Sequence, residues 1–254
     1  MTERSLHGRR IVVTRAVHQA AELVAAFEAA GATVVSLPLI EVAAAADPEP
    51  LARAAATLAS FDWLAFTSAN AVRAFLPWTA AATLPPVAAV GPATARALRC
   101  HGVEPRLEAE ASRAEGLAEA LAPAIEPGTR VLVPQAEDAR PQLVDNLRTA
   151  GAEVTPVAAY RKRLPAASRA LAGRLFADSP LGWVTFTSPR IVRHFAAVLG
   201  PSWKGRRDEL RAISIGPVTS EELRRQGVEP TAEASRPSPE AMVRAVQESR
   251  IIDR

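Results

Sequence analysis

The chain has 254 residues, of which 48% are hydrophobic and 22% charged, so its composition is that of a soluble globular protein with one large or two modest domains. Its one cysteine, Cys100, excludes an intrachain disulfide and favours a reducing compartment. The N-terminus carries no apolar signal segment, and no uncharged apolar stretch reaches the roughly 18 residues of a membrane span, so we expect a cytoplasmic protein without a membrane partner.

The net charge is +3, and only Lys162 and Lys204 of the 30 basic residues are lysines. Arginine presents a fixed fork of donors that suits carboxylates and phosphates, although a GC-rich genome would also favour arginine. Aromatic residues make up 5% of the chain, and the longest basic run is Arg161-Lys162-Arg163. A nucleic-acid binder needs clustered basic residues with interleaved aromatics, so nucleic acid is not an expected partner.

The first half of the chain alternates between strand and helix patterns. In chain order these are a strand at 10–13, an amphipathic helix around 22–27 that ends at Gly31, a strand at 33–37, a buried strand at 61–67 with a helix from Ser68, and a strand at 87–90 with a helix from Pro92 to Gly102. Cys100 lies near the end of the last helix, where we expect a small side chain that is at least partly buried.

The same order recurs in the second half, with strands at 130–133, 153–157, 182–187 and 212–215. Several helix starts carry capping residues: Ser188 and Ser238 each precede a proline, and Ser112 stands three residues before Glu115. Strands separated by helical stretches of about ten or more residues predict βαβ units with right-handed crossovers and a parallel sheet.

Six motifs occur twice and in the same order along the chain. They begin at Gly8 and Gly128, Ala30 and Ala150, Phe66 and Phe186, Val72 and Val192, Gly91 and Gly216, and Gly102 and Gly227. The offset is 120 residues for the first four pairs and 125 for the last two. Such a series indicates an internal duplication, and we expect an α/β protein of two similar lobes that face each other across a cleft.

Polar residues of the repeat stand where strands end and helices begin. These are Thr67, Ser68, Thr187 and Ser188, which follow strands, and Thr94 and Thr219, which fall in the first turns of helices opened by Gly-Pro. Ligands of open parallel sheets bind at the carboxyl ends of strands, and a helix N-terminus favours an anion. These positions therefore suit a ligand with several carboxylates or phosphates, although the same residue types are common helix caps.

Motifs for other kinds of chemistry are missing from the sequence. No Gly-x-Gly-x-x-Gly follows a strand, no Walker Gly-Lys-Ser/Thr occurs, and no Gly-x-Ser-x-Gly or Cys/His nucleophile pattern is present. The histidines, His7, His18, His101 and His194, are scattered without metal-ligand spacing. We therefore expect a reaction that needs no cofactor, metal or covalent nucleophile.

The ordered motifs together resemble a known family. They are Val-Val-Thr-Arg at 12–15, Pro38-x-Ile40, Phe66 to Val72, Val90-Gly91-Pro92-x-Thr94, Tyr160, Phe186 to Pro189, Ile215-Gly216-Pro217-x-Thr219 and the stretch from Pro237 to Met242. No single motif is highly specific, but the ordered series spans almost the whole chain and resembles uroporphyrinogen-III synthase.

The resemblance implies a flavodoxin-like fold for each lobe, a parallel sheet flanked by helices, with the two lobes joined by a pair of extended linker strands. It also implies that the lobes do not follow the two halves of the sequence. Lobe 1 would contain residues 1–37 and 162–254, lobe 2 would contain residues 44–155, and residues 38–43 and 156–161 would form the linkers.

The resemblance further implies a reaction. The family closes the polycarboxylate hydroxymethylbilane to uroporphyrinogen III, with loss of water and inversion of ring D, in haem, sirohaem and cobalamin biosynthesis. This would make the protein a lyase without cofactor, in transient contact with the preceding pathway enzyme, and because no long apolar surface stripe demands a partner we expect a monomer. Because the bilane closes spontaneously to isomer I, the task of the protein is to hold the substrate so that a different carbon of ring D reacts.

Site residues follow from the resemblance position by position. Tyr160 would assist the departure of hydroxide as a hydrogen-bond donor, although the only tyrosine of the chain can also be a packing residue at the hinge. The substrate-binding residues that the resemblance implies are Arg15, Thr67, Ser68, Thr94, Arg140, Thr187, Ser188 and Thr219.

The turn from Gln135 to Arg140 departs from the family pattern. Many relatives have an Arg-Gly-rich turn that ends in arginine, whereas this chain has Gln135-Ala136-Glu137-Asp138-Ala139-Arg140. Glu137 and Asp138 would repel an anionic substrate if they faced it. A second hypothesis is therefore a non-catalytic regulatory protein of the same fold that binds a tetrapyrrole or another polyanion. A third, a two-lobed sugar or amino-acid binding protein, rests on the cleft alone, and the missing export signal argues against it.

Overall fold

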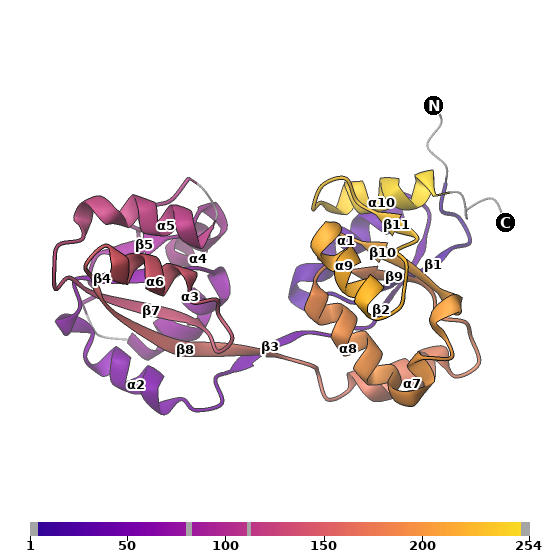
Figure 1. Cartoon of the computed structure of the whole chain (residues 1–254), viewed down its shortest axis with the longest axis horizontal. Coiled ribbons are helices and arrows are strands. Elements are labelled where there is room, and N and C mark those ends of the chain that lie inside the picture. The colour runs from indigo at the N-terminus through magenta and orange to yellow at the C-terminus, as the bar shows by residue number, and fades with distance from the viewer. Residues whose placement is uncertain (1–4, 80–82, 111–112, 250–254) are drawn as a thin grey trace. The chain divides into compact units, whose positions relative to one another are not determined.

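The chain folds into two compact units (Figure 1). The computed structural model describes residues 5–79, 83–110 and 113–249. Unit 1 comprises Met1–Glu41 and Arg163–Arg254, and unit 2 comprises Val42–Lys162. Both units are built from strands that alternate with helices along the chain.

Unit 1 contains a five-stranded sheet in the order β11-β10-β9-β1-β2, in which every neighbouring pair is parallel. Its strands are β1 (Arg10–Val13), β2 (Thr33–Ser36), β9 (Gly182–Phe186), β10 (Leu210–Ser214) and β11 (Ala232–Glu233). Its helices are α1 (Val17–Ala29), α7 (Ser168–Phe176), α8 (Pro189–Leu199), α9 (Pro217–Arg225) and α10 (Pro239–Glu248).

Side chains alternate between the two faces of this sheet, as the geometry of a strand requires. Val12 and Phe186 pack with residues of α7, α8 and α9, whereas Ile11 and Val13 pack with residues of α1 and α10. Because both faces are covered, the strands are almost continuously apolar, which is typical of a parallel sheet. Unit 1 is therefore a three-layer structure with a hydrophobic core on each side of the sheet.

Unit 2 contains a six-stranded sheet in the order β3-β8-β7-β4-β5-β6, with parallel pairing from β8 to β6. Its strands are β3 (Glu41–Ala44), β4 (Trp63–Phe66), β5 (Val87–Ala89), β6 (Leu107–Glu108), β7 (Arg130–Ala136) and β8 (Glu153–Arg163). Its helices are α2 (Glu49–Ala56), α3 (Ala69–Phe75), α4 (Pro92–Cys100), α5 (Ala114–Leu121) and α6 (Gln142–Thr149).

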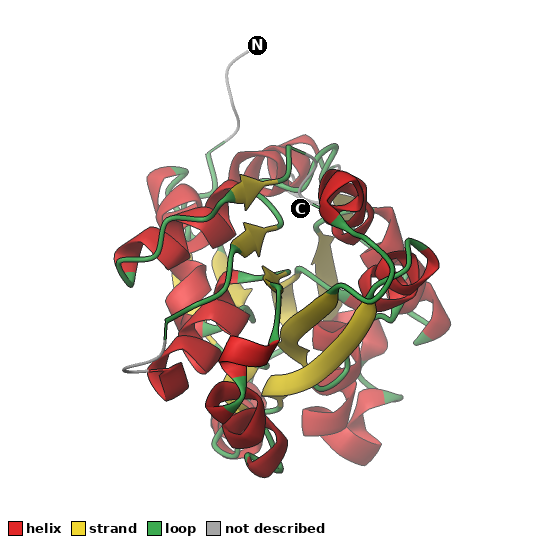
Figure 2. Cartoon of the chain, turned by 90° about the vertical axis from the view of Figure 1, so that its left-hand side faces the viewer, coloured by secondary structure: helices red, strands yellow, loops and turns green. Residues whose placement is uncertain are grey.

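Helices cover both faces of this second sheet as well (Figure 2). Leu64 and Phe66 of β4 pack with residues of α2, α3 and α4, whereas Trp63 and Ala65 pack with residues of α5 and α6. The expected α/β class, with two similar lobes that are each a parallel sheet flanked by helices, is confirmed.

The two copies of the sequence repeat contribute to both sheets. Unit 1 combines β1 and β2 of the first copy with β9, β10 and β11 of the second, and unit 2 combines β4, β5 and β6 of the first copy with β7 and β8 of the second. Numbered along the chain within unit 1, the strand order is 2-1-3-4-5, which is the flavodoxin-like order. The strands of unit 2 other than β3 have the same order when β7 and β8 are matched to β1 and β2, and β3 adds a sixth strand beside β8.

The duplication is visible in side-chain contacts too. Arg99 donates three hydrogen bonds of 2.9 to 3.1 Å to the carboxylate of Glu104, and Arg224 does the same to Glu229, 125 positions later. The bonds from each arginine hold the pKa of its carboxyl partner below the usual range. Because both pairs are exposed to solvent, they contribute little stability and mainly record the common origin of the copies.

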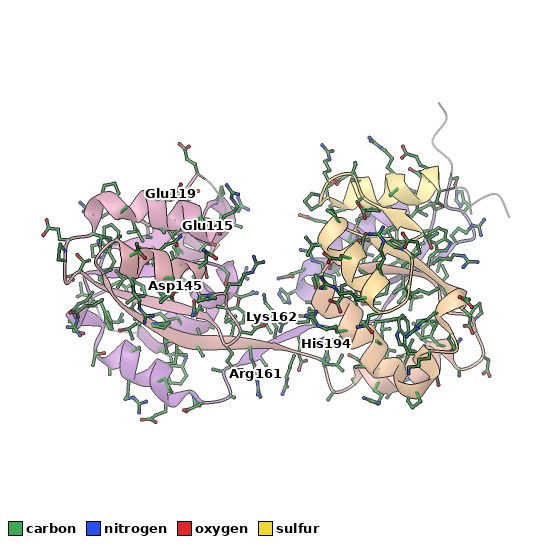
Figure 3. The ribbon with its side chains drawn as sticks, in the orientation of Figure 1. Glu115, Glu119, Asp145, Arg161, Lys162 and His194 are labelled. Atoms are coloured by element: carbon green, nitrogen blue, oxygen red, sulfur yellow. The ribbon has the colours of Figure 1, made fainter. Side chains whose placement is uncertain are left out.

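The segment that follows β2 is bonded to unit 1 through two carbonyl groups. Ser168 Oγ donates to the Pro38 carbonyl, and His194 Nδ1, labelled in Figure 3, donates to the Leu39 carbonyl, each at 2.6 Å. At the start of β3, Glu41 pairs with Arg163 at the end of β8, with 2.6 Å between Oε1 and Nε. The linker segments and lobe boundaries stated above remain predictions.

Three predictions about single residues have different outcomes. Ser238 caps α10 by accepting a 3.2 Å hydrogen bond from the Ala241 N–H, as predicted, whereas Ser112 lies outside the described residues. The prediction for Cys100 is wrong because its side chain is exposed. Ala95 and Leu98 form the buried face of α4, and Cys100 falls on the other side of that helix.

None of the described helices has the length and apolar character needed to cross a membrane.

Phe195 joins three aromatic rings in the core of unit 1. Its ring is fully buried and meets Phe176, Phe186 and Trp203 edge-on, with centroids 5.3 to 6.0 Å apart. We expect Phe195→Ala to lower the free energy of unfolding by about 3–5 kcal/mol, because it leaves a cavity among these three rings.

Urea unfolding measures the effect, with Val17→Ala as the control, since Val17 is 71% exposed. The control should change stability by about 0.5 kcal/mol or less. A loss in Phe195→Ala no larger than that of the control would contradict the assigned core.

Candidate active site

The order of strands reverses at one point in each sheet. This point lies between β1 and β9 in unit 1 and between β7 and β4 in unit 2. In open α/β sheets ligands bind outside the carboxyl ends of the strands at such a reversal, because the flanking helices diverge there onto opposite faces. The sheet topology therefore points to one candidate ligand-binding edge in each unit.

Several predicted site residues lie at these edges. In unit 1, Arg15 follows β1, and Thr187 and Ser188 follow β9. In unit 2, Thr67 and Ser68 follow β4, and Arg140 belongs to the turn after β7. Arg15, Thr67, Ser68, Thr187 and Ser188 are half-buried, and Arg140 is exposed.

Ser68 and Ser188 are both helix caps. Each has extended backbone geometry, and the side chain accepts a main-chain N–H three residues on, from Ala71 at 3.1 Å or from Ile191 at 3.4 Å. A hydroxyl that accepts an N–H in this way still has its own hydrogen to donate. Capping and ligand binding are therefore compatible roles for the same side chain.

The two serines differ in one contact. The hydroxyl oxygen of Ser68 lies 3.1 Å from the phenol oxygen of Tyr160, so the two groups are hydrogen-bonded. Tyr160 is only 4% exposed and packs in the core between the sheet and helices α2, α3 and α4. In the first copy of the repeat, the position that corresponds to Tyr160 is Ile40, which has no hydroxyl.

An irregularity in β8 directs Tyr160 to this face of the sheet. Gln135 pairs with Ala158, but the next pair is Ala136 with Tyr160, so β8 contains one extra residue, Ala159. Consecutive strand residues normally point to opposite faces, yet Ala159 and Tyr160 belong to the same core cluster. The extra residue therefore turns Tyr160 towards Ser68, in the way that bulges re-aim side chains near active sites.

Thr94 and Thr219 occupy equivalent places as the third residues of α4 and α9. Both side chains are buried, at 4% and 3% exposure, and the main-chain N–H groups donate to the carbonyls of Gly91 and Gly216 at 3.0 Å. Since these N–H groups are already used within the helix, each threonine can offer a ligand its hydroxyl only.

The turn after β7 places its acidic residues in different surroundings. Glu137 Oε1 accepts the Ala46 N–H at 2.5 Å, and the Glu137 N–H donates to the Tyr160 carbonyl at 2.9 Å. The carboxylate of Glu137 is therefore engaged by the main chain of unit 2. Asp138 is exposed at the surface of the turn.

Arg15, Arg140 and Lys162 are among the side chains that place positive charge at the strand ends. Within the described residues, neither Arg15 nor Arg140 has a hydrogen-bond or ion-pair partner. Lys162 follows Tyr160 by two residues, and its Nζ lies 6.0 Å from the centre of the tyrosine ring. Arg161 and Lys162 leave β8 on opposite sides of the strand (Figure 3).

Sequence reasoning missed Lys162 and the bonded role of Glu137. The signal for Lys162 was its spacing of two from Tyr160 on an extended segment, which puts both side chains on one face of a regular strand end. No local signal marks the partner of Glu137, because that partner is a main-chain group 91 positions away. In the described part of the chain, no three His, Cys, Asp or Glu side chains gather closely enough to hold a metal ion.

These features define a class of protein: a two-unit α/β protein with hydroxyl and cationic groups at the strand ends where ligands of such sheets bind. Comparison with known proteins identifies the family. A family model described as uroporphyrinogen-III synthase HemD matches residues 21–244. The uroporphyrinogen-III synthase of Synechococcus elongatus is 36% identical over 231 residues, which cover 87% of this chain and 87% of that protein.

The chain therefore belongs to the uroporphyrinogen-III synthase family, a family of lyases in tetrapyrrole biosynthesis. Solved structures show the same fold. A uroporphyrinogen-III synthetase from Helicobacter pylori has a TM-score of 0.61 at 21% identity, over 92% of this chain and 96% of that one. A mutant uroporphyrinogen III synthase from Thermus thermophilus has a TM-score of 0.58 at 22% identity, over 95% and 100%. The resemblance inferred from the sequence is confirmed.

The contact between Ser68 and Tyr160 has a measurable consequence for stability. Ser68→Ala should cost about 2 kcal/mol, of which about 1 is the lost cap and about 1 the hydroxyl of Tyr160 left without its partner. Ser188→Ala is the matched control because it removes an equivalent cap with no tyrosine beside it, and it should cost about 1 kcal/mol.

The same substitution in a Tyr160→Phe background isolates the contact. There Ser68→Ala should cost no more than the cap. Urea unfolding of the wild type, the two single variants and the double variant gives the coupling free energy between the two hydroxyls. Equal costs in the two backgrounds would show that the hydroxyl pair does not stabilise unit 2.

Proposed function

We propose that this chain is a uroporphyrinogen-III synthase, which closes hydroxymethylbilane to uroporphyrinogen III with loss of water and inversion of ring D. Family membership supports the reaction class. The structural observation that supports roles for particular atoms is the hydrogen bond between Ser68 and Tyr160, at the carboxyl ends of the strands of unit 2.

Tyr160 would assist the first step, the departure of hydroxide from the hydroxymethyl carbon. Ser68 Oγ accepts the Ala71 N–H, and when Ser68 in turn donates to the phenol oxygen, the hydrogen of Tyr160 remains available for the leaving oxygen. Hydrogen bonds in such a chain polarise one another, so the phenol becomes a better donor without being ionised. With loss of the pyrrole N–H proton as well, the product of this step is an electrophilic azafulvene, and water is released in sum.

Ring closure would then depend on how the bilane is held. Attack by the substituted carbon of ring D gives a spiro intermediate, which fragments and closes again with that ring inverted. Isomer I forms spontaneously, so the enzyme has to make the less accessible carbon the nearer one. A C–O bond is exchanged for a C–C bond and water is released, so the reaction transfers no electrons and needs no redox cofactor.

The carboxylates of the substrate would be bound by the residues at the strand ends of each unit. Arg15 and Arg140 are cations without protein partners in the described part of the chain, and a guanidinium can bind a carboxylate with two parallel hydrogen bonds. Hydroxyl donors for the remaining carboxylates are Thr67 and Thr94 in unit 2 and Thr187, Ser188 and Thr219 in unit 1, whereas the hydrogen of Ser68 is donated to the phenol of Tyr160.

The proposal places the protein in the cytoplasm as a monomer, in keeping with its single cysteine. Because hydroxymethylbilane closes by itself, rapid transfer during a transient contact with the preceding pathway enzyme would limit the loss of substrate to isomer I.

The alternative, a regulatory protein that binds a tetrapyrrole without turnover, was motivated by Glu137 and Asp138. Its main support weakens because the carboxylate of Glu137 accepts the Ala46 N–H within unit 2. Purified protein given freshly made hydroxymethylbilane distinguishes the two. A product dominated by isomer III supports the synthase, whereas isomer I alone, with tight tetrapyrrole binding, supports the regulator.

Two substitutions test the assigned residues in the same assay. Tyr160→Phe and Thr219→Ala should each lower kcat for isomer III by about tenfold or more, which corresponds to about 1.4 kcal/mol of transition-state stabilisation. Ser238→Ala is the control, because it removes a helix cap from α10 and no residue of the proposed site. Near-normal rates in both site variants would mean that neither hydroxyl takes part in the reaction.

A further inference from the structure

Glu137 makes two hydrogen bonds, one to the irregular part of β8 and one to the segment after β3. Its N–H donates to the carbonyl of Tyr160, the residue directly after the extra Ala159, and its carboxylate accepts the N–H of Ala46. In the sheet, β8 lies between β7, which precedes Glu137, and β3, which precedes Ala46. Glu137 therefore connects the segments that follow the two neighbours of β8.

We propose that Glu137 is a positioning residue for Tyr160. Its carboxylate fixes the turn after β7 to the segment after β3, and its main-chain N–H then holds the bulge that directs the phenol to Ser68. Tyr160 is thus held at its carbonyl by Glu137, at 2.9 Å, and at its hydroxyl by Ser68, at 3.1 Å. The effect that we expect on kcat rests on the proposed function, whereas the effect that we expect on the environment of Tyr160 rests on these contacts alone.

Positioning and charge repulsion make opposite predictions for substitutions of Glu137. If the carboxylate mainly repelled an anionic substrate, Glu137→Gln would speed the reaction. For a positioning residue, Glu137→Gln keeps an oxygen that accepts the Ala46 N–H and stays close to wild type. Glu137→Asp keeps the charge but is one methylene too short for the contact, so it should behave like Glu137→Ala.

The structural consequence can be measured without substrate. Tyr160 is the only tyrosine, so protein labelled with ¹³C at the tyrosine Cζ gives a single NMR signal from the residue in question. Glu137→Ala and Glu137→Asp should shift or broaden this signal, and Glu137→Gln should leave it at the wild-type position. Glu119→Gln on α5, where Glu119 is exposed and labelled in Figure 3, is the control and should leave it unchanged.

The kinetic consequence is a loss of kcat rather than of binding. Glu137→Ala should lower kcat for isomer III by about tenfold with KM changed less than about twofold, because it disturbs a group that acts in the transition state. Adding Glu137→Ala to Tyr160→Phe should slow the enzyme by no more than about a further twofold, since both changes remove the same phenol function.

An unshifted tyrosine signal in Glu137→Ala and Glu137→Asp would overturn the inference, as would a Glu137→Gln enzyme faster than wild type or losses that multiply in the double variant. Should Glu137→Ala fail to fold, Glu137→Asp and Glu137→Gln provide the same comparison. If the wild-type protein forms only isomer I, the proposed function is contradicted. The NMR comparison would still decide whether Glu137 positions Tyr160.

Discussion

Parallel pairing of the strands is the constraint on which the rest of this structure depends. Because helices return the chain to the same edge of each sheet, the carboxyl ends of the parallel strands all lie at the opposite edge. Ser68 and Tyr160 are 92 positions apart in the sequence and still form a hydrogen bond there. The residues proposed to act on the substrate can therefore come from distant segments of the chain.

Duplication supplied two similar sets of strand ends, and later divergence made their side chains differ. Ser68 and Ser188 retain the same cap, and Thr94 and Thr219 retain the same place in a helix. Only the second copy has a tyrosine at the position that corresponds to Ile40 of the first. The hydroxyl pair is thus confined to unit 2, whereas groups that suit carboxylates remain at the strand ends of both units.

Much of the fold could be predicted from local patterns, but the contacts of the site could not. Strands such as β1 and β4 are short apolar runs, and glycine and serine mark the helix ends. β3 is different, because Glu-Val-Ala-Ala carries no strand signal and depends on pairing with β8. The sequence could predict which kinds of residue, serine, threonine and arginine, stand where the strands end. Their contacts depend on the extra Ala159 and on a main-chain partner of Glu137, which belong to tertiary structure.

The central claim of the proposed function is that the phenol of Tyr160 donates a hydrogen bond to the departing hydroxide. Because the chain has one tyrosine, growth with 3-fluorotyrosine changes the acidity of this phenol and of no other group. At a pH where the phenol stays neutral, the more acidic fluorophenol is the stronger donor, so kcat for isomer III should rise relative to the unlabelled enzyme. An unchanged or lower kcat, in a protein of unchanged stability, would contradict this role.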